Sequence, residues 1–246
     1  MLPLFRRGTF DSAIWSWVHH EYPAIPASFE PGDVFIDVGC HTGAVSELAA
    51  TRGATVFGYE ANRENYWLAS INLKGFRSVT LHQAAIWRSD IRAAGPLVFT
   101  PSADNQNTGG GSVMFSSPED YWSARPREEP ITAPATMAPS SHSVFPMALD
   151  DVLTSHGPAR VLKLDVEGAE FPILLTSRRL DLVDLVVGEY HEFTDSAMAA
   201  LAPISVVGRE LYTADLLSRC LAVFGFEVRT TSPDRHGRGF FTGART

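Results

Sequence analysis

Residues 34–43 read Val-Phe-Ile-Asp-Val-Gly-Cys-His-Thr-Gly, and they carry the strongest structural signal in the chain. An apolar run ends in an Asp-x-Gly-x-x-x-Gly loop, after which residues 44–51 have the pattern of a helix. A buried strand, a tight glycine turn and a helix N-terminus in succession form nucleotide pockets in α/β folds. Glycines let the backbone approach a ligand, and the first helical turn offers free N–H groups. We therefore expect a nucleotide-like ligand here, with a plain strand-to-helix turn as the alternative.

The middle of this loop indicates which ligand is expected. A dinucleotide fingerprint reads Gly-x-Gly-x-x-Gly, because the second glycine makes room for a pyrophosphate. This chain has His41 at that position, and its next glycine is Gly43. The loop therefore favours a nucleoside ligand without a pyrophosphate, and S-adenosylmethionine is the first candidate.

Composition narrows the class of protein. The chain has 246 residues, of which 45% are hydrophobic, and this suits one α/β domain with an insertion. Its two cysteines, Cys40 and Cys220, show neither metal-type spacing nor a disulfide framework, so we expect a reducing, cytoplasmic setting. A net charge of −8 without a basic stripe argues against nucleic acid as a partner. No apolar run approaches a membrane span, so we expect no membrane partner, and a homo-oligomer is left open.

Hydrophobic periodicity predicts alternating strands and helices, which is typical of βαβ units in a mostly parallel sheet. The expected strands are residues 34–38, 54–59, 79–86, 161–165 and 182–190. The expected helices are residues 11–22, 44–51 and 61–73, a helix running through 174–177, and residues 210–224. With two further strands at the C-terminal end, we predict a Rossmann-like, mostly parallel sheet of seven strands with helices on both faces.

The C-terminal end departs from the parallel pattern. Residues 226–231 and 239–242 both resemble strands, and only the polar loop 232–238 separates them. A parallel crossover needs a dozen or more residues, so this pair should be an antiparallel hairpin. Nicotinamide-binding domains usually keep every strand parallel, whereas S-adenosylmethionine-dependent methyltransferases reverse the last strand.

Residues 101–146 interrupt the alternation with Gly109-Gly110-Gly111, seven prolines and little helical periodicity. A stretch of this length inside a domain is usually a functional lid or a disordered segment. Its glycines suit either a hinge or a slack hairpin turn. We expect one domain over residues 1–246, with a helical extension at 1–30 and a substrate lid at 101–146.

Polar residues at the ends of the expected strands are the candidates for ligand binding. Glu60 closes the second strand about twenty residues after the glycine loop, where an acidic residue accepts hydrogen bonds from ribose hydroxyls. Asn62 suits either the ribose or the cap of the following helix. Gln83 and Ala84 lie where an adenine edge would be read, or at a plain strand exit. The candidate cofactor-binding residues are Asp37, Gly39, His41, Thr42, Gly43, Glu60, Ala61, Asn62, Gln83 and Ala84.

The candidate catalytic residues follow the fourth and fifth strands. Asp165 ends a buried strand and so points into the crevice where open α/β sheets bind ligands. Lys163 precedes it inside the sheet, and a buried lysine needs an acidic partner. His191 ends the next strand, and its ordinary pKa range suits proton transfer. We expect Asp165 and His191 to act as a pair, the alternative for His191 being a purely structural role.

Two of the neighbouring acids have a second interpretation. Glu167 and Glu170 suit the first turn of a helix, where carboxylates are favoured electrostatically. A cluster of acids would instead hold Mg²⁺ and lower the pKa of an acceptor hydroxyl, although the sequence does not require a metal. That cluster would consist of Asp150, Asp151, Asp165, Glu167 and Glu170.

Four segments resemble the FkbM family of methyltransferases in order and spacing, over about residues 31–191. They are Asp37-Val38-Gly39-Cys40-His41-Thr42-Gly43, Tyr59-Glu60-Ala61-Asn62, Ala148-Leu149-Asp150-Asp151-Val152-Leu153 and Leu162-Lys163-Leu164-Asp165-Val166-Glu167-Gly168-Ala169-Glu170. The resemblance implies a class I methyltransferase fold and methylation of hydroxyl groups on sugars, macrolides and other natural products. It implies that Asp37, Gly39 and Gly43 hold the methionine part of the cofactor and Glu60 the ribose. Cys40-His41 departs from the Ala-Asn that the family usually has.

We therefore expect an S-adenosylmethionine-dependent O-methyltransferase that acts on a small hydroxylated metabolite. An NAD-dependent oxidoreductase would share the strand, loop and strand-end acid, but His41 and the terminal hairpin argue against it. A non-catalytic cofactor-binding protein would keep the loop and is the other alternative.

Overall fold

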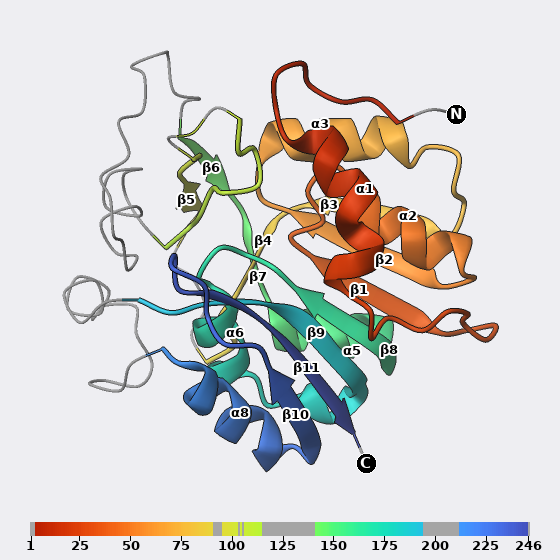
Figure 1. The fold of residues 1–246 in the computed structure, drawn as a ribbon. Coiled ribbons are helices and arrows are strands. Elements are labelled where there is room, and N and C mark those ends of the chain that lie inside the picture. The colour runs from red at the N-terminus through yellow and green to blue at the C-terminus, as the bar shows by residue number, and fades with distance from the viewer. Residues whose placement is uncertain are drawn as a thin grey trace.

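The computed structural model describes residues 3–90, 95–102, 104, 106–114, 141–193 and 212–245. The predicted α/β fold is confirmed, because its main sheet has seven strands in the order β10-β11-β9-β8-β1-β2-β3 (Figure 1). These strands are β1 (Val34–Val38), β2 (Thr55–Glu60), β3 (Val79–Gln83), β8 (Ala159–Leu164), β9 (Val183–His191), β10 (Phe226–Thr230) and β11 (Arg238–Arg245). From β3 to β9 the neighbours are parallel, so their carboxyl ends share one edge of the sheet.

The predicted C-terminal hairpin is also confirmed. β11 pairs antiparallel with both β10 and β9. It begins at Arg238 and is longer than the expected strand 239–242, because its whole length pairs with the long strand β9. This insertion of β11 beside β9 brings Arg238 next to the carboxyl end of β9.

Helices cover both faces of the sheet (Figure 1). They are α1 (Asp11–Glu21), α2 (Ala44–Thr51), α3 (Arg63–Asn72), α5 (Leu149–His156), α6 (Glu170–Thr176) and α8 (Ala214–Val223), with a short 3₁₀ helix η1 (Leu180–Leu182). Successive residues of a strand point to opposite faces, so in β1 Phe35 packs with α1 and α2, whereas Ile36 packs with α5, α6 and α8. The near-continuous apolar character of the central strands follows from this double coverage.

The expected strand 79–86 is divided in the structure. β3 ends at Gln83, and β4 (Ala85–Trp87) pairs in parallel with β7 (Pro146–Ala148) in a separate two-stranded sheet. The backbone N–H of Ala84 still donates to the Glu60 carbonyl at 3.1 Å, and the next residues leave the main sheet. Periodicity alone did not reveal this change of partner, because both pieces are apolar and extended.

The expected insertion 101–146 is described only in part. β5 (Leu97–Phe99) pairs antiparallel with β6 (His142–Val144), and Thr100 forms an isolated bridge with Ser112. Residues 115–140, which hold most of the expected lid, lie outside the described residues. So do residues 210 and 211, the start of the expected helix 210–224.

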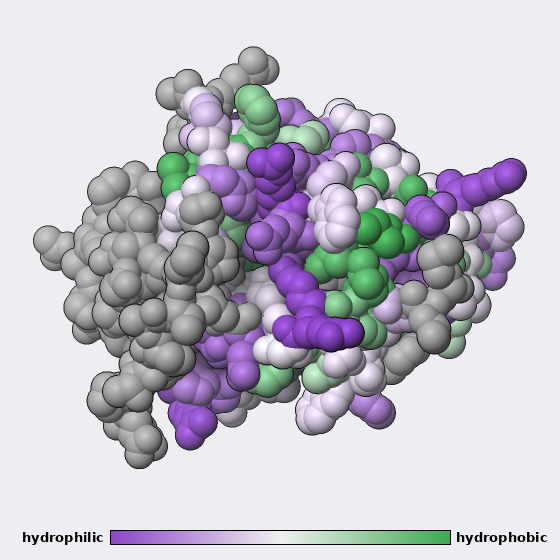
Figure 2. All heavy atoms as spheres, turned by 90° about the horizontal axis from the view of Figure 1, so that it is seen from above, coloured by the Kyte–Doolittle hydropathy of each residue, from purple (hydrophilic) through white to green (hydrophobic). Residues whose placement is uncertain are grey.

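The described surface is mixed in character. On the face seen from above, hydrophilic residues run across the middle of the molecule beside a smaller hydrophobic patch (Figure 2). Within the described ranges, none of the helices has the length and apolar character that a bilayer crossing requires.

We predict that Leu162→Ala lowers the free energy of unfolding by about 2–5 kcal/mol, because it leaves a cavity in a core that cannot close around it. Leu162 is fully buried in β8, between Ile36 of β1 and Val186 of β9. Chemical denaturation measures the loss. Val223→Ala is the control, because Val223 is 83% exposed and should change stability by less than about 0.5 kcal/mol. Equal effects of the two substitutions would contradict the assignment of this core.

Candidate functional site

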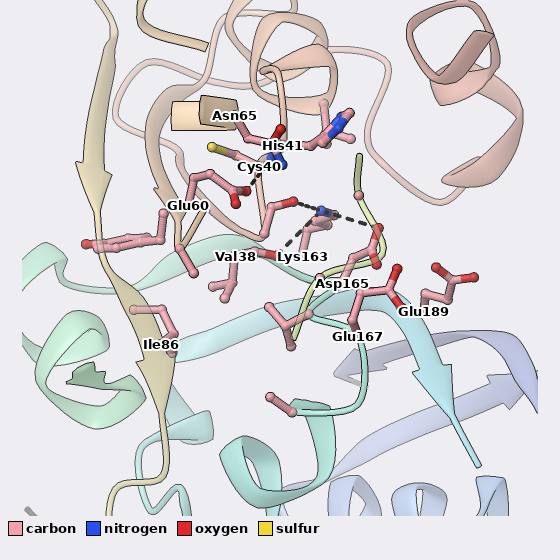
Figure 3. A pocket seen from close by; sticks show the side chains of 18 of the residues that line it. Val38, Cys40, His41, Glu60, Asn65, Ile86, Lys163, Asp165, Glu167 and Glu189 are labelled. Atoms are coloured by element: carbon pink, nitrogen blue, oxygen red, sulfur yellow. Dashed lines mark hydrogen bonds and ion pairs between the residues drawn. The ribbon is translucent and has the colours of Figure 1, made fainter. Parts of the chain in front are cut away.

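A cavity of about 180 Å³ lies at the carboxyl ends of the parallel strands, the position at which open α/β sheets bind ligands (Figure 3). Its floor comes from the loop after β1, the end of β2, the turn after β8 and the end of β9. Two further walls come from α1 and from residues 107–113. The expected loop and strand-end residues therefore meet in one place, together with part of the expected insertion 101–146 and with α1, which the sequence did not place there.

The glycines of the loop are required by its geometry. Gly39 has a φ of 77°, and a Cβ on it would overlap the Asp165 backbone carbonyl. Gly43 has a φ of 99° and precedes the first turn of α2, and a Cβ there would lie 2.7 Å from Leu73 Cδ1. Side chains at either position would push the loop away from β8 or α3. These glycines thus fix the loop by close packing against β8 and α3.

The residues between the two glycines divide between the cavity and the core behind it. Cys40 and His41 line the cavity. The Cys40 thiol is 3% exposed, and burial, followed by the nearby Asp37 and Glu60 carboxylates, raises its pKa well above the usual value. Thr42 is fully buried behind the loop, where its carbonyl accepts a hydrogen bond from the Asn72 side chain at 3.0 Å.

Glu60 presents a buried carboxylate to the cavity from the end of β2. Its Oε2 accepts a hydrogen bond from the backbone N–H of His41, and its Oε1 accepts one from the N–H of Asn62, each at 2.8 Å. Burial raises the pKa of Glu60 to about 7, although these two hydrogen bonds oppose the rise. Carboxylate oxygens have about four acceptor sites, so this group is oriented by the backbone and still has capacity for a ligand.

Asn62 caps α3 rather than facing the cavity. Its Oδ1 accepts hydrogen bonds from the backbone N–H groups of Glu64 at 2.9 Å and Asn65 at 3.5 Å. Of the two roles that the sequence left open for Asn62, the structure thus places it in the capping position. Asn65, one turn further along, does line the cavity, and no sequence pattern had singled it out.

The expected cofactor-binding residues fall into two groups. Those that line the cavity are Gly39, His41, Glu60, Ala61 and Ala84. Those that lie behind or beside it are Asp37, Thr42, Gly43, Asn62 and Gln83. Gln83 is exposed at the last position of the edge strand β3, opposite Glu60 in register.

A buried lysine ties the loop after β1 to the end of β8 (Figure 3). Lys163 is 2% exposed, and its Nζ donates a hydrogen bond to the Gly39 carbonyl at 2.7 Å. The same Nζ lies 3.3 Å from Asp37 Oδ1 and 3.7 Å from Asp165 Oδ2. Burial opposes the charge, but these two carboxylates outweigh it and raise the pKa of Lys163. Ser46 of α2 completes the cluster by donating to Asp37 Oδ2 at 2.7 Å.

Asp165 follows β8 directly and points into the cavity (Figure 3). Its Oδ2 accepts a hydrogen bond from the Tyr22 hydroxyl at 2.9 Å. Burial would raise the pKa of Asp165, but the charges of Lys163 and His191 and the bond from Tyr22 hold it below the ordinary value. Asp165 is therefore ionised at neutral pH. Tyr22 lies at the end of α1. Its contact with Asp165 joins segments that are far apart in the chain, and no local sequence pattern predicts it.

His191 is fully buried. We expected it to pair with Asp165, but its ring nitrogens lie beside two other carboxylates. Its Nδ1 lies 3.2 Å from Glu170 Oε1, and its Nε2 lies 3.3 Å from Glu167 Oε2. Glu170 also accepts hydrogen bonds from the backbone N–H groups of Val166 and Gly168, each at 2.9 Å. Glu170 and His191 thus brace the turn after β8 from behind, and only Glu167 of these three residues lines the cavity.

The carboxylates that would have formed a magnesium cluster do not come together. Asp150 accepts hydrogen bonds from the Ser177 hydroxyl at 2.6 Å and from the backbone N–H of Arg178, so it caps a turn away from the cavity. Asp151 is exposed on α5. In the part of the chain that the structure describes, no group of three His, Cys, Asp or Glu residues is arranged to hold a metal ion.

Glu189, near the carboxyl end of β9, was not among the candidate site residues predicted from the sequence. Glu189 lines the cavity, with its Oε1 2.9 Å from Arg238 Nε on the neighbouring strand β11. Burial and the nearby Asp165 and Glu167 carboxylates raise the pKa of Glu189 well above its usual value. Glu21 of α1 faces the same end of the cavity, and burial followed by Asp165 raises its pKa as well. Glu189 lies two residues before His191 in the sequence. Of these two residues, we had considered only the histidine as a candidate for proton transfer.

No protein-family model and no curated protein sequence matches the chain. Solved structures are similar to it in fold. EvdMO1 gives a TM-score of 0.50 at 12% identity, covering 99% of this chain and 44% of that one. A candidate S-adenosylmethionine-dependent methyltransferase from Listeria monocytogenes gives 0.49 at 12%, covering 95% and 99%. Precorrin-6y C5,15-methyltransferase from Geobacter metallireducens GS-15 gives 0.47 at 12%, covering 99% and 94%. The chain thus shares a Rossmann-like fold with EvdMO1, and at 12% identity the likeness concerns the fold alone.

We predict that Lys163→Met lowers the free energy of unfolding by about 3–5 kcal/mol, because it leaves Asp37 and Asp165 without their buried counter-charge. The only other lysine, Lys74, is exposed and provides the matched control as Lys74→Met. Thermal and chemical denaturation of both variants measure the difference. Similar stabilities of the two variants would show that the ammonium is not required by the loop.

Proposed function

We propose that this protein is an S-adenosylmethionine-dependent O-methyltransferase whose acceptor is a hydroxyl of a small natural product or sugar-containing metabolite. The observation that carries the proposal is the Glu60 carboxylate, which the backbone N–H groups of His41 and Asn62 orient at the rim of the cavity. A carboxylate in this position suits the two hydroxyls of a ribose. The FkbM-like segments support the same activity and favour a natural-product acceptor.

The residues around the cavity fit this cofactor. Ala61 and Ala84 form an apolar wall beside Glu60 and would take the adenine ring. Gly39 would lie against the methionine part, since Lys163 holds its carbonyl and leaves the loop open toward the cavity. When bound, S-adenosylmethionine supplies a strongly electrophilic methyl group on a cationic sulfur.

Asp165 is the residue we propose for the acceptor proton. Because its pKa is held low, the carboxylate is charged at neutral pH and accepts a hydrogen bond from the acceptor hydroxyl. Tyr22 and Lys163 fix the direction of the carboxylate, so the hydroxyl oxygen is aligned before reaction. The proton of the hydroxyl passes to Asp165 as the oxygen is methylated. His191 acts as a positioning residue, because it supports the turn through Glu167 and Glu170.

We predict that the protein binds S-adenosylmethionine and that Glu60→Ala weakens binding about ten- to a hundredfold, the usual effect of losing a charge-assisted hydrogen bond. The pKa of Glu60 is about 7, and the ionised form is the better acceptor. Wild-type affinity should therefore fall as the pH drops through about 7, and this dependence should vanish in the variant. Calorimetry from pH 6 to 8.5 measures both effects, with the exposed Glu227→Ala as control. Preferential binding of NAD would contradict the proposal and favour an oxidoreductase.

We predict that Asp165→Asn lowers methyl transfer by about 10²–10⁴-fold while changing cofactor affinity little, because it removes the proton acceptor and keeps its size. Transfer of labelled methyl from S-adenosylmethionine to a panel of hydroxylated sugars and macrolides identifies a wild-type substrate for the assay. Asp184→Asn, at an exposed position of β9, is the matched control. Normal turnover of Asp165→Asn from pH 6 to 9 would assign the carboxylate a structural role.

A further inference from the structure

A fully buried carboxylate lies at the start of α1, outside the proposed active site. Asp11 is 0% exposed, and Arg6 surrounds it with three donors. The backbone N–H and Nε of Arg6 donate to Asp11 Oδ2 at 3.1 and 2.9 Å, and Nη2 donates to Oδ1 at 3.1 Å. Burial opposes ionisation, but Arg6 and the Thr108 hydroxyl together lower the pKa of Asp11. Asp11 is therefore a charged acceptor inside the protein.

The Thr108 hydroxyl bridges this carboxylate and the glycine loop, whose His41 Nε2 also lies 3.7 Å from Asp11 Oδ1. The Thr108 hydroxyl donates to Asp11 Oδ1 at 2.6 Å, and His41 Nε2 lies 2.9 Å from the same Thr108 oxygen. A threonine hydroxyl has a single proton, which an ionised carboxylate must receive. Nε2 of His41 is therefore the donor to Thr108. Burial lowers the pKa of His41 to about 4, so at neutral pH the ring is neutral with its proton on Nε2.

Further hydrogen bonds fasten the same three segments together. Asn65 on α3 donates from Nδ2 to the Thr108 carbonyl at 3.0 Å, and its Oδ1 accepts from Arg6 Nη2 at 2.6 Å. The backbone N–H of Phe10 donates to the Gln106 carbonyl at 3.0 Å. Residues 6–11, the glycine loop, Asn65 and residues 106–108 thus form one partly buried polar network.

We call residues 106–113 the strap, because both ends are fastened while the middle lines the cavity. One end is held by Asp11 through Thr108. At the other end, the Ser112 hydroxyl donates to the Glu167 carbonyl in the turn after β8 at 2.9 Å. The strap residues that line the cavity are Asn107, Gly109, Gly111, Ser112 and Val113.

We propose that Asp11 is a positioning residue for cofactor binding: through Thr108 it holds the strap and the His41 ring against the cavity and so slows cofactor release. The inference rests on the proposed function, because its ligand is S-adenosylmethionine. It assigns a role to residues 6–11, which the proposed reaction does not use. The physical basis is the Thr108 hydroxyl, which lies within hydrogen-bond distance of both Asp11 and His41, whereas His41 Nε2 and Asp11 Oδ1 are 3.7 Å apart.

The test compares two substitutions of Thr108, one that removes its hydroxyl and one that keeps it. Thr108→Val keeps the shape of the side chain and removes the hydroxyl, whereas Thr108→Ser keeps the hydroxyl. We expect Thr108→Val to raise the dissociation rate and the Kd of S-adenosylmethionine about tenfold, and Thr108→Ser to stay within about twofold of wild type. Asp11→Asn should change the dissociation rate in the same direction as Thr108→Val. Stopped-flow fluorescence and calorimetry measure these values, and the exposed Thr230→Val is the control.

The outcomes separate this inference from the proposed function. A wild-type protein that does not bind S-adenosylmethionine would overturn the proposed function, and the inference with it. Wild-type binding that Glu60→Ala weakens, with an unchanged dissociation rate in Thr108→Val, would overturn only the inference. Equal losses in Thr108→Val and Thr108→Ser would overturn it as well, because packing rather than the hydroxyl would then be responsible. A Tm of ligand-free Thr108→Val close to wild type, with faster release, supports the positioning role.

Discussion

The ammonium of Lys163 is the constraint on which the rest of the site depends. A buried charge is tolerated only when it is paired and hydrogen-bonded, and Lys163 meets both conditions with Asp37, Asp165 and the Gly39 carbonyl. These partners come from two neighbouring parallel strands and the loop between β1 and α2. Because one cation holds them all, the loop, the floor of the cavity and the direction of the Asp165 carboxylate form a single unit. The charge of Lys163 also helps to keep the pKa of Asp165 low, and its proposed role requires an ionised carboxylate.

The sheet, and the end of the site that we propose for the nucleoside, follow from local sequence and were therefore predictable. The strand, glycine loop and helix at residues 34–51 are contiguous, and the short loop 232–238 forces a reversal by length alone. Glu60 follows from its distance along the chain to the loop, and its orientation depends on backbone N–H groups only two and nineteen residues away. The split of residues 79–86 was not predictable in this way, because the partner of β4 is more than fifty residues distant.

The end of the site near Asp165, which we propose for the methyl acceptor, depends on contacts that no local sequence pattern predicts. Tyr22 reaches Asp165 from a helix 143 residues earlier in the chain, and Glu189 meets Arg238 only because β11 inserts beside β9. Likewise, the ring nitrogens of His191 lie beside Glu167 and Glu170 because the register of β9 directs the imidazole behind the turn. The nucleoside end is thus built from neighbouring residues and the acceptor end from remote ones. Substitutions of Tyr22 or Arg238 are therefore expected to alter this end while the hydrogen bonds from His41 and Asn62 to Glu60 stay unchanged.

The position of Cys40 has a consequence for covalent chemistry. A thiol reacts with alkylating agents and oxidants as its thiolate, and burial beside two carboxylates keeps this sulfur protonated. The same holds less strongly for Cys220, whose pKa burial raises to about 11. Both thiols should therefore resist oxidation, and a reagent reaches Cys40 only by entering the cavity whose wall it forms. Adduct formation at Cys40 would then report how often the cavity is open, and any molecule bound there would protect the sulfur.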